Sequence, residues 1–78
     1  MNSLPMKQSF TVIIEKDEDS DMYVGEVPGL SGCHTQGKTI DELMKNMREV
    51  IELCLEMEAD KVHDLPKFVG LQQIEVTA

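Results

Sequence analysis

Residues 23–56 carry the strongest structural signals in this chain and read YVGEVPGLSGCHTQGKTIDELMKNMREVIELCLE. The segment begins with a strand-like pattern, turns at Pro28-Gly29 and continues as a short strand over residues 33–36. Proline and glycine interrupt regular structure, because proline lacks an amide donor and glycine accepts unusual backbone angles. We therefore predict two strands separated by a sharp corner and followed at once by a helix.

The helix has a clear start signal. Thr39 and Glu42 have the spacing of a capping box, which satisfies free backbone amides at a helix start. Apolar residues then recur every three or four positions, as in an amphipathic helix. This apolar stripe consists of Ile40, Leu43, Met44, Met47, Val50, Ile51, Cys54 and Leu55. We expect a helix that ends near residue 57 or 58, with this stripe in the core.

Strand-like alternation continues on both sides of this segment. Residues 9–16 alternate, with Phe10, Val12 and Ile14 on the inward face, and the turn-favouring run 17–21 joins them to a strand at 22–27. Residues 72–77 predict a fourth strand. The C-terminal residues expected to lie inward or to close the end of the core are Phe68, Val69, Leu71, Ile74 and Val76.

The predicted order is therefore β-β-β-α-β, in one domain over residues 1–78 with a loose leader at 1–6. The crossover through the helix is right-handed and brings the fourth strand parallel to the first. We expect an α+β fold with a four-stranded mixed sheet of order 3-2-1-4 and one helix on one face. Ile13 and Tyr23 are expected on the uncovered face, where other copies of the chain would pack to form a dimer or tetramer.

The size and charge of the chain limit the classes of function that it can have. A chain of 78 residues supports one small domain, and such domains often gain stability from self-association. Its 15 acids and 7 bases give a net charge of −8, which argues against direct nucleic-acid binding and fits either a basic partner or a solvated surface. The sequence has no signal peptide and no apolar run of about 18 residues, so we expect a cytoplasmic protein without a membrane span.

Asp17, Asp19 and Asp21 have the spacing that begins a calcium-binding loop. Met22 stands at the position of the loop glycine and Pro28 at that of the bidentate glutamate, so we expect a solvated hairpin tip instead.

Cysteine and histidine do not predict a metal or catalytic site. Cys33 and His34 are neighbours on a strand and point to opposite faces, while Cys54 belongs to the apolar stripe of the helix. We predict no catalytic residue, no metal site and no cofactor.

The segment also resembles the HicB family of antitoxins. The matching runs are YVGEVPGL at 23–30, GCHTQG at 32–37, TIDEL at 39–43 and NMREVIE at 46–52. The resemblance implies a partial RNase H-like fold and an antitoxin that binds and occludes HicA, a small basic mRNA interferase. Many family members carry a C-terminal DNA-binding domain, and this chain is expected to be a short form without one, which does not bind the operator alone.

Two alternatives stay open. The first is an orphan homo-oligomeric HicB-like domain with a regulatory or scaffold role and no toxin. The second is a metal-dependent nuclease, which would need convergence of carboxylates from Glu15, Glu75 and the helix acids Glu42 or Glu49. The residues predicted to bind a partner are Asp17, Asp19, Asp21, Glu26, Pro28, Gly29 and Leu30.

Overall fold

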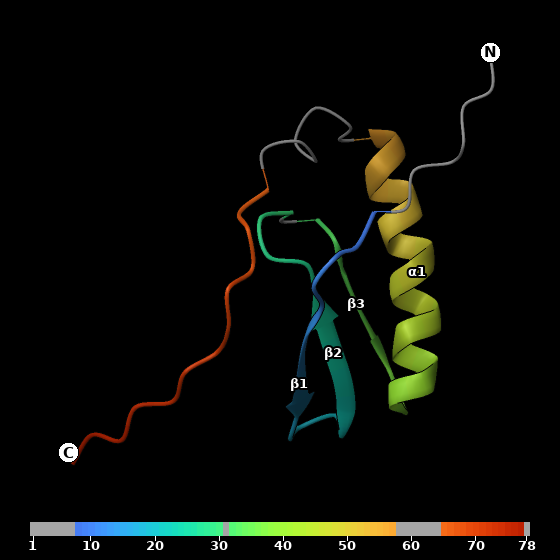
Figure 1. Cartoon of the computed structure of the whole chain (residues 1–78). Helices are drawn as coiled ribbons and strands as arrows, with labels where there is room; N and C mark the ends of the chain where they lie inside the picture. Colours follow the sequence, from blue (N-terminus) through green and yellow to red (C-terminus); the bar gives the residue numbers. More distant parts are fainter. Residues whose placement is uncertain (1–7, 31, 58–64, 78) are drawn as a thin grey trace.

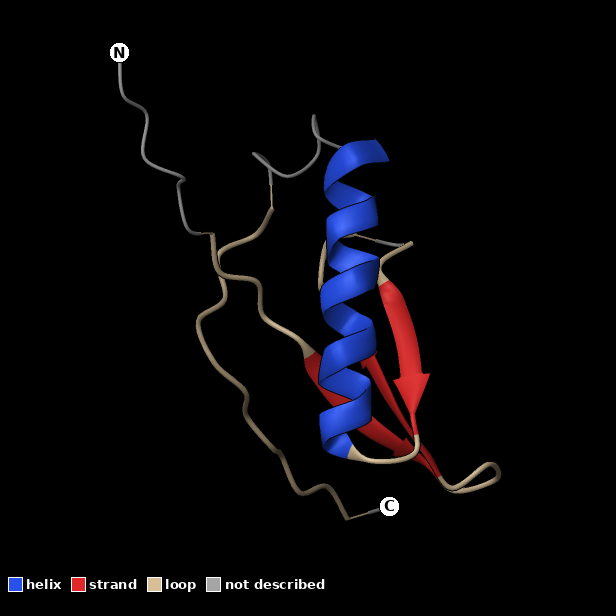
Figure 2. Cartoon of the chain, turned by 90° about the vertical axis from the view of Figure 1, so that its right-hand side faces the viewer, coloured by secondary structure: helices blue, strands red, loops and turns tan. Residues whose placement is uncertain are grey.

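A computed structural model describes residues 8–30, 32–57 and 65–77. Its elements are β1 (Ile13–Asp17), β2 (Met22–Glu26), β3 (His34–Gly37) and α1 (Ile40–Met57), and the strands form one antiparallel sheet of order β1-β2-β3 (Figure 1). Figure 2 shows α1 packed along one face of this sheet. The α+β class and the order of the first four elements are therefore as predicted.

The start of α1 has the predicted cap. The Thr39 hydroxyl Oγ1 accepts a hydrogen bond from the Glu42 amide at 3.0 Å. The Glu42 carboxylate accepts from the amide of Lys38 at 3.3 Å, one residue before the helix cap. Both bonds stabilise the first turn, because the first amides of a helix have no partner within the helix.

The core lies between α1 and the corner that follows β2. Its buried residues are Val27, Leu30, Cys33, Leu43, Met47 and Cys54. The corner itself is held by backbone hydrogen bonds from the Val27 amide to the Cys33 carbonyl at 3.0 Å and from the Cys33 amide to the Leu30 carbonyl at 3.0 Å. These bonds hold Leu30 and Cys33 in positions where both are buried in the core.

The register of β1 and β2 separates two residues that were expected on one face. Ile13 lies opposite Glu26, whereas Tyr23 lies opposite Lys16. Successive strand residues face opposite sides of a sheet, so Ile13 and Tyr23 face opposite sides, and Tyr23 packs partly against the core. The prediction that they share the uncovered face is wrong, and Val24 accompanies Ile13 there instead.

Helix α1 covers only part of the sheet. It contacts β3 and β2, and among the described residues it makes no contact with β1. Ile14 lies on the helix-facing side, since it is opposite Gly25, yet it is 39% exposed. The edge strand β1 therefore extends beyond the cover of the helix.

The fourth strand is not formed within the chain. Residues 65–77 have no regular secondary structure, and Ile74 and Val76 are 84% and 79% exposed instead of inward. Phe68, Val69 and Leu71 are also exposed and do not close the core. The order 3-2-1-4 and the RNase H-like sheet both need this strand, and a strand forms only where a neighbouring edge pairs with its backbone. The predicted leader, residues 1–6, lies outside the described residues.

Candidate partner-binding surfaces

The hairpin tip uses two of its three aspartates to hold its own shape. The Asp17 carboxylate accepts hydrogen bonds from the Asp19 amide at 3.2 Å and the Ser20 hydroxyl at 2.9 Å. Asp21 adopts a left-handed backbone with φ of 61°, and its amide donates to the Asp17 carbonyl at 2.8 Å. Asp and Asn tolerate this conformation better than most residues, which explains Asp21 at this position.

The one base near the tip is already paired. Lys16 Nζ lies 3.1 Å from Asp21 Oδ1 and 5.4 Å from the centre of the Tyr23 ring. The hydrogen bond and the charge of Asp21 raise the pKa of the Lys16 ammonium above its usual value. The pair is solvent-exposed, so it contributes little to stability.

The β1–β2 hairpin carries a large share of the negative charge of the chain. Six acids and one base lie between Glu15 and Glu26, in a chain whose net charge is −8. Glu18 and Asp19 are exposed, and within the described part of the chain no side-chain hydrogen bond or ion pair engages their carboxylates. The hairpin is therefore a region of concentrated and solvent-exposed negative charge.

A shallow pocket lies at the other end of β2. This corner pocket, with a volume of about 270 Å³, is lined by Ile13, Glu26, Val27, Pro28, Gly29 and Leu30. It brings together four of the residues predicted to bind a partner. Leu30 is only 2% exposed, so its side chain serves the core and offers little surface to a partner.

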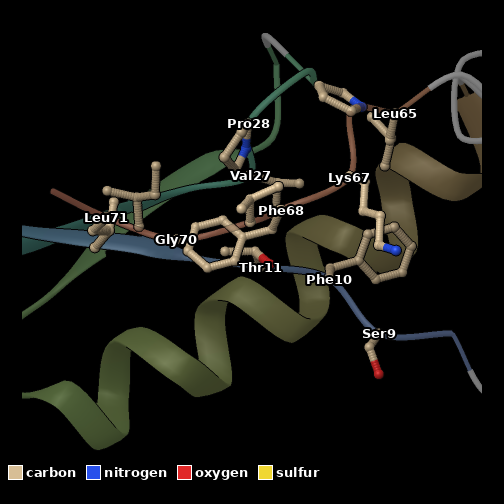
Figure 3. Close-up of a pocket in the computed structure, with 13 residues that line it drawn as sticks. Ser9, Phe10, Thr11, Val27, Pro28, Leu65, Lys67, Phe68, Gly70 and Leu71 are labelled. Carbon is tan, nitrogen blue, oxygen red and sulfur yellow. The ribbon is translucent and has the colours of Figure 1, made fainter.

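A larger lateral cavity of about 520 Å³ adjoins the corner pocket (Figure 3). Ile13, Val27 and Pro28 line both. The remaining lining residues are Ser9, Phe10 and Thr11 before β1 and residues 65–71 of the C-terminal segment. Phe10 packs against the core, as the alternation of residues 9–16 predicts, and also lines this cavity. The sequence pattern did not indicate the cavity, because its walls come from segments far apart in the sequence.

The predicted partner residues therefore form two sites and not one. The acidic tip and the corner pocket lie at opposite ends of β2, which spans Met22–Glu26 and separates them by about 17 Å at the usual rise of a strand. One partner must be wide enough to follow the hairpin if it is to touch both.

The cysteines and histidine lie as the strand geometry predicted. Cys33 is buried and His34 is exposed, and no disulfide bond joins the buried Cys33 and Cys54. No group of three or more His, Cys, Asp or Glu side chains among the described residues is placed to hold a metal ion. Glu15 lies on the face away from the helix, so it does not meet Glu42 or Glu49. In the same part of the chain, no helix has the length and apolar character to cross a membrane.

A three-stranded sheet under one helix, with an acidic hairpin and apolar pockets, defines a small acidic α+β domain. The family model for the HicB_like antitoxin of bacterial toxin-antitoxin system matches residues 10–77. The chain belongs to this family of HicB-like antitoxins. Membership implies an antitoxin role and a toxin partner in general.

Relatives of similar length support the assignment. A UPF0150 protein from Synechocystis sp. is 54% identical over 70 residues, which cover 90% of this chain and 97% of the relative. UPF0150 proteins from Archaeoglobus fulgidus and Thermotoga maritima are 52% and 44% identical, over 86% and 91% of this chain and 93% of each relative. No solved structure matches the chain significantly.

Proposed function

We propose that this chain binds and occludes a small basic mRNA interferase of the HicA type. The observation that carries the proposal is the family match over residues 10–77, which spans every described element. The proposed action is stoichiometric binding in the cytoplasm, without catalysis and without direct binding of nucleic acid by this chain.

The acidic hairpin is the surface best suited to the first encounter with such a toxin. A basic RNA-cleaving enzyme must attract phosphates, and a dense acidic surface competes for the same positive groups. Glu18 and Asp19 at the tip, together with Glu15 and Glu26 along the strands, supply that charge on one element. The corner pocket, with Pro28 and Gly29, then offers apolar contact at the other end of the hairpin.

The direct test is co-expression with any small basic protein that proves to be encoded next to this chain. We expect the two to co-purify and the complex to suppress RNA cleavage by the toxin in proportion to the amount of this chain. An RNase assay with the purified chain alone, with magnesium or manganese, serves as the control for the nuclease alternative. Absence of a complex with any adjacent basic protein would contradict the proposal and favour the orphan domain.

Self-association is a second part of the proposal. Val69, Leu71, Ile74 and Val76 are between 74% and 93% exposed in the single chain. Soluble monomers rarely expose so many apolar side chains in one short segment, because covering them is favourable. We propose a homo-oligomer in which a second copy covers this segment.

A further inference from the structure

The outer edge of β1 has no strand beside it in the single chain. β1 pairs with β2 on one side, and no other described strand adjoins it. An edge strand presents unpaired N–H and C=O groups and accepts an added strand readily. Beside it lies Ile14, 39% exposed on the helix-facing side because α1 does not reach β1. The edge therefore lacks both a backbone partner and an apolar cover.

The C-terminal segment has the sequence pattern of a strand, but it pairs with no edge in the single chain. Ile74 and Val76 alternate with Gln73, Glu75 and Thr77, which is the pattern of a strand with one apolar face. The segment has no regular secondary structure in the single chain, and its apolar residues face solvent. The segment and the outer edge of β1 therefore both lack a strand to pair with.

The start of the segment is held at the corner. A Cβ on Gly29 would lie 2.8 Å from Pro66 Cδ and 2.9 Å from Leu65 Cδ2, so both side chains pack directly on Gly29. Leu65 also packs against the core. Beyond this anchor, Figures 1 and 2 both show the segment running apart from the sheet, and the lateral cavity lies between its first residues and the start of β1. The segment therefore does not pack against the sheet of its own chain.

We propose that two copies of this chain exchange their C-terminal segments. Residues 71–77 of each copy add a strand to the β1 edge of the partner copy, and Ile74 and Val76 cover the partner's exposed Ile14. The arrangement rests on the self-association proposed above and specifies its contact. It is reciprocal, so a two-fold dimer closes and leaves neither β1 edge open.

A disulfide experiment separates exchange from closure within one chain. Glu15 lies near the middle of β1 and Glu75 near the middle of the segment, and both have the outward alternation. Under mild oxidation we expect the double variant Glu15→Cys/Glu75→Cys to form a covalent dimer, linked between position 15 of one chain and position 75 of the other. Each single variant is the control. A link found only within one chain, or no link between these positions, would overturn the exchange.

Sedimentation provides the second measurement. We expect the full chain to sediment as a dimer, Ile74→Asp/Val76→Asp to sediment as a monomer, and the control Gln73→Asp/Thr77→Asp, with the same added charge, to remain a dimer. Circular dichroism of α1 checks that each variant is folded. A dimer that survives Ile74→Asp/Val76→Asp would overturn the exchange and leave self-association intact, whereas a monomeric wild-type chain would overturn both.

Discussion

Gly37 shows most directly how one residue permits this fold. It ends β3, where the first turn of α1 passes directly over the strand. A Cβ at this position would lie 2.5 Å from the Leu43 amide nitrogen and 2.8 Å from its Cα. These neighbours are backbone atoms of a helix and have little freedom to move, so any larger residue must push α1 away from the sheet.

We therefore expect Gly37→Ala to lower the free energy of unfolding by about 2 kcal/mol, as overpacking of a tight contact does. Chemical denaturation followed by circular dichroism measures the change. The matched control is Gly32→Ala, because a Cβ there has no atom within 4 Å. Equal stabilities of the two variants would show that the approach of α1 to β3 is looser than the structure has it.

At the scale of single elements, α1 and the β1–β2 hairpin depend on local side-chain bonds. The Thr39 hydroxyl satisfies the Glu42 amide, and the Asn46 side-chain amide donates to the Gln36 carbonyl at 2.9 Å, which ties the helix to the end of β3. In the hairpin, Asp17 organises the turn by accepting two bonds. These bonds explain why α1 begins directly after Thr39 and why the chain turns after Asp17.

Removal of the helix cap should have a modest and specific cost. We expect Thr39→Ala to destabilise the chain by about 1 kcal/mol, because the Glu42 amide loses its acceptor. Thr39→Ser keeps the hydroxyl and should stay within a few tenths of wild type. Thermal unfolding of the three proteins at one concentration tests this, and an equal loss for the alanine and serine variants would rule out the hydroxyl as the cause.

The charge of the hairpin should govern the rate of toxin binding. We expect Glu18→Lys/Asp19→Lys to slow association with the basic toxin by about tenfold at low salt, and the effect should shrink at high salt as screening increases. Glu49→Lys/Glu56→Lys on exposed positions of α1 changes the net charge equally and serves as the control. Stopped-flow or surface-based kinetics measure both. If the two double variants slow association equally, total charge and not the hairpin steers the encounter.

At the scale of the whole molecule, a small core leaves much apolar surface uncovered. Only six described residues form the buried core, whereas the C-terminal segment exposes Val69 at 93% and Ile74 at 84%. A small domain gains stability by binding another surface, because association couples to folding.

The thermal midpoint of the wild-type chain should therefore rise with protein concentration. Association stabilises the folded state by mass action, whereas the midpoint of a monomer does not depend on concentration. We expect the monomeric variant Ile74→Asp/Val76→Asp to show a constant midpoint. Calorimetry over a hundredfold range of concentration provides the measurement, and a constant midpoint for the wild-type chain would contradict self-association.

Signals between nearby residues in the sequence were sufficient to predict part of this fold. The sequence alone determined the β1–β2 hairpin, the corner at Pro28-Gly29 and the capped helix, because caps, turns and helical stripes depend on residues a few positions apart. The acidic charge of the hairpin and the family resemblance were also readable there. The strand-like alternation of residues 72–77 was equally visible, but the sequence did not show which strand this segment would pair with.

Tertiary structure decided what depends on distant neighbours. The register of β1 against β2 placed Tyr23 on the helix side, the close approach of α1 required glycine at position 37, and Leu30 became core instead of surface. It also left residues 72–77 without an edge in their own chain. A strand is completed by backbone hydrogen bonds to a neighbour, and the sequence of one strand does not specify whether that neighbour lies in the same chain or in another copy.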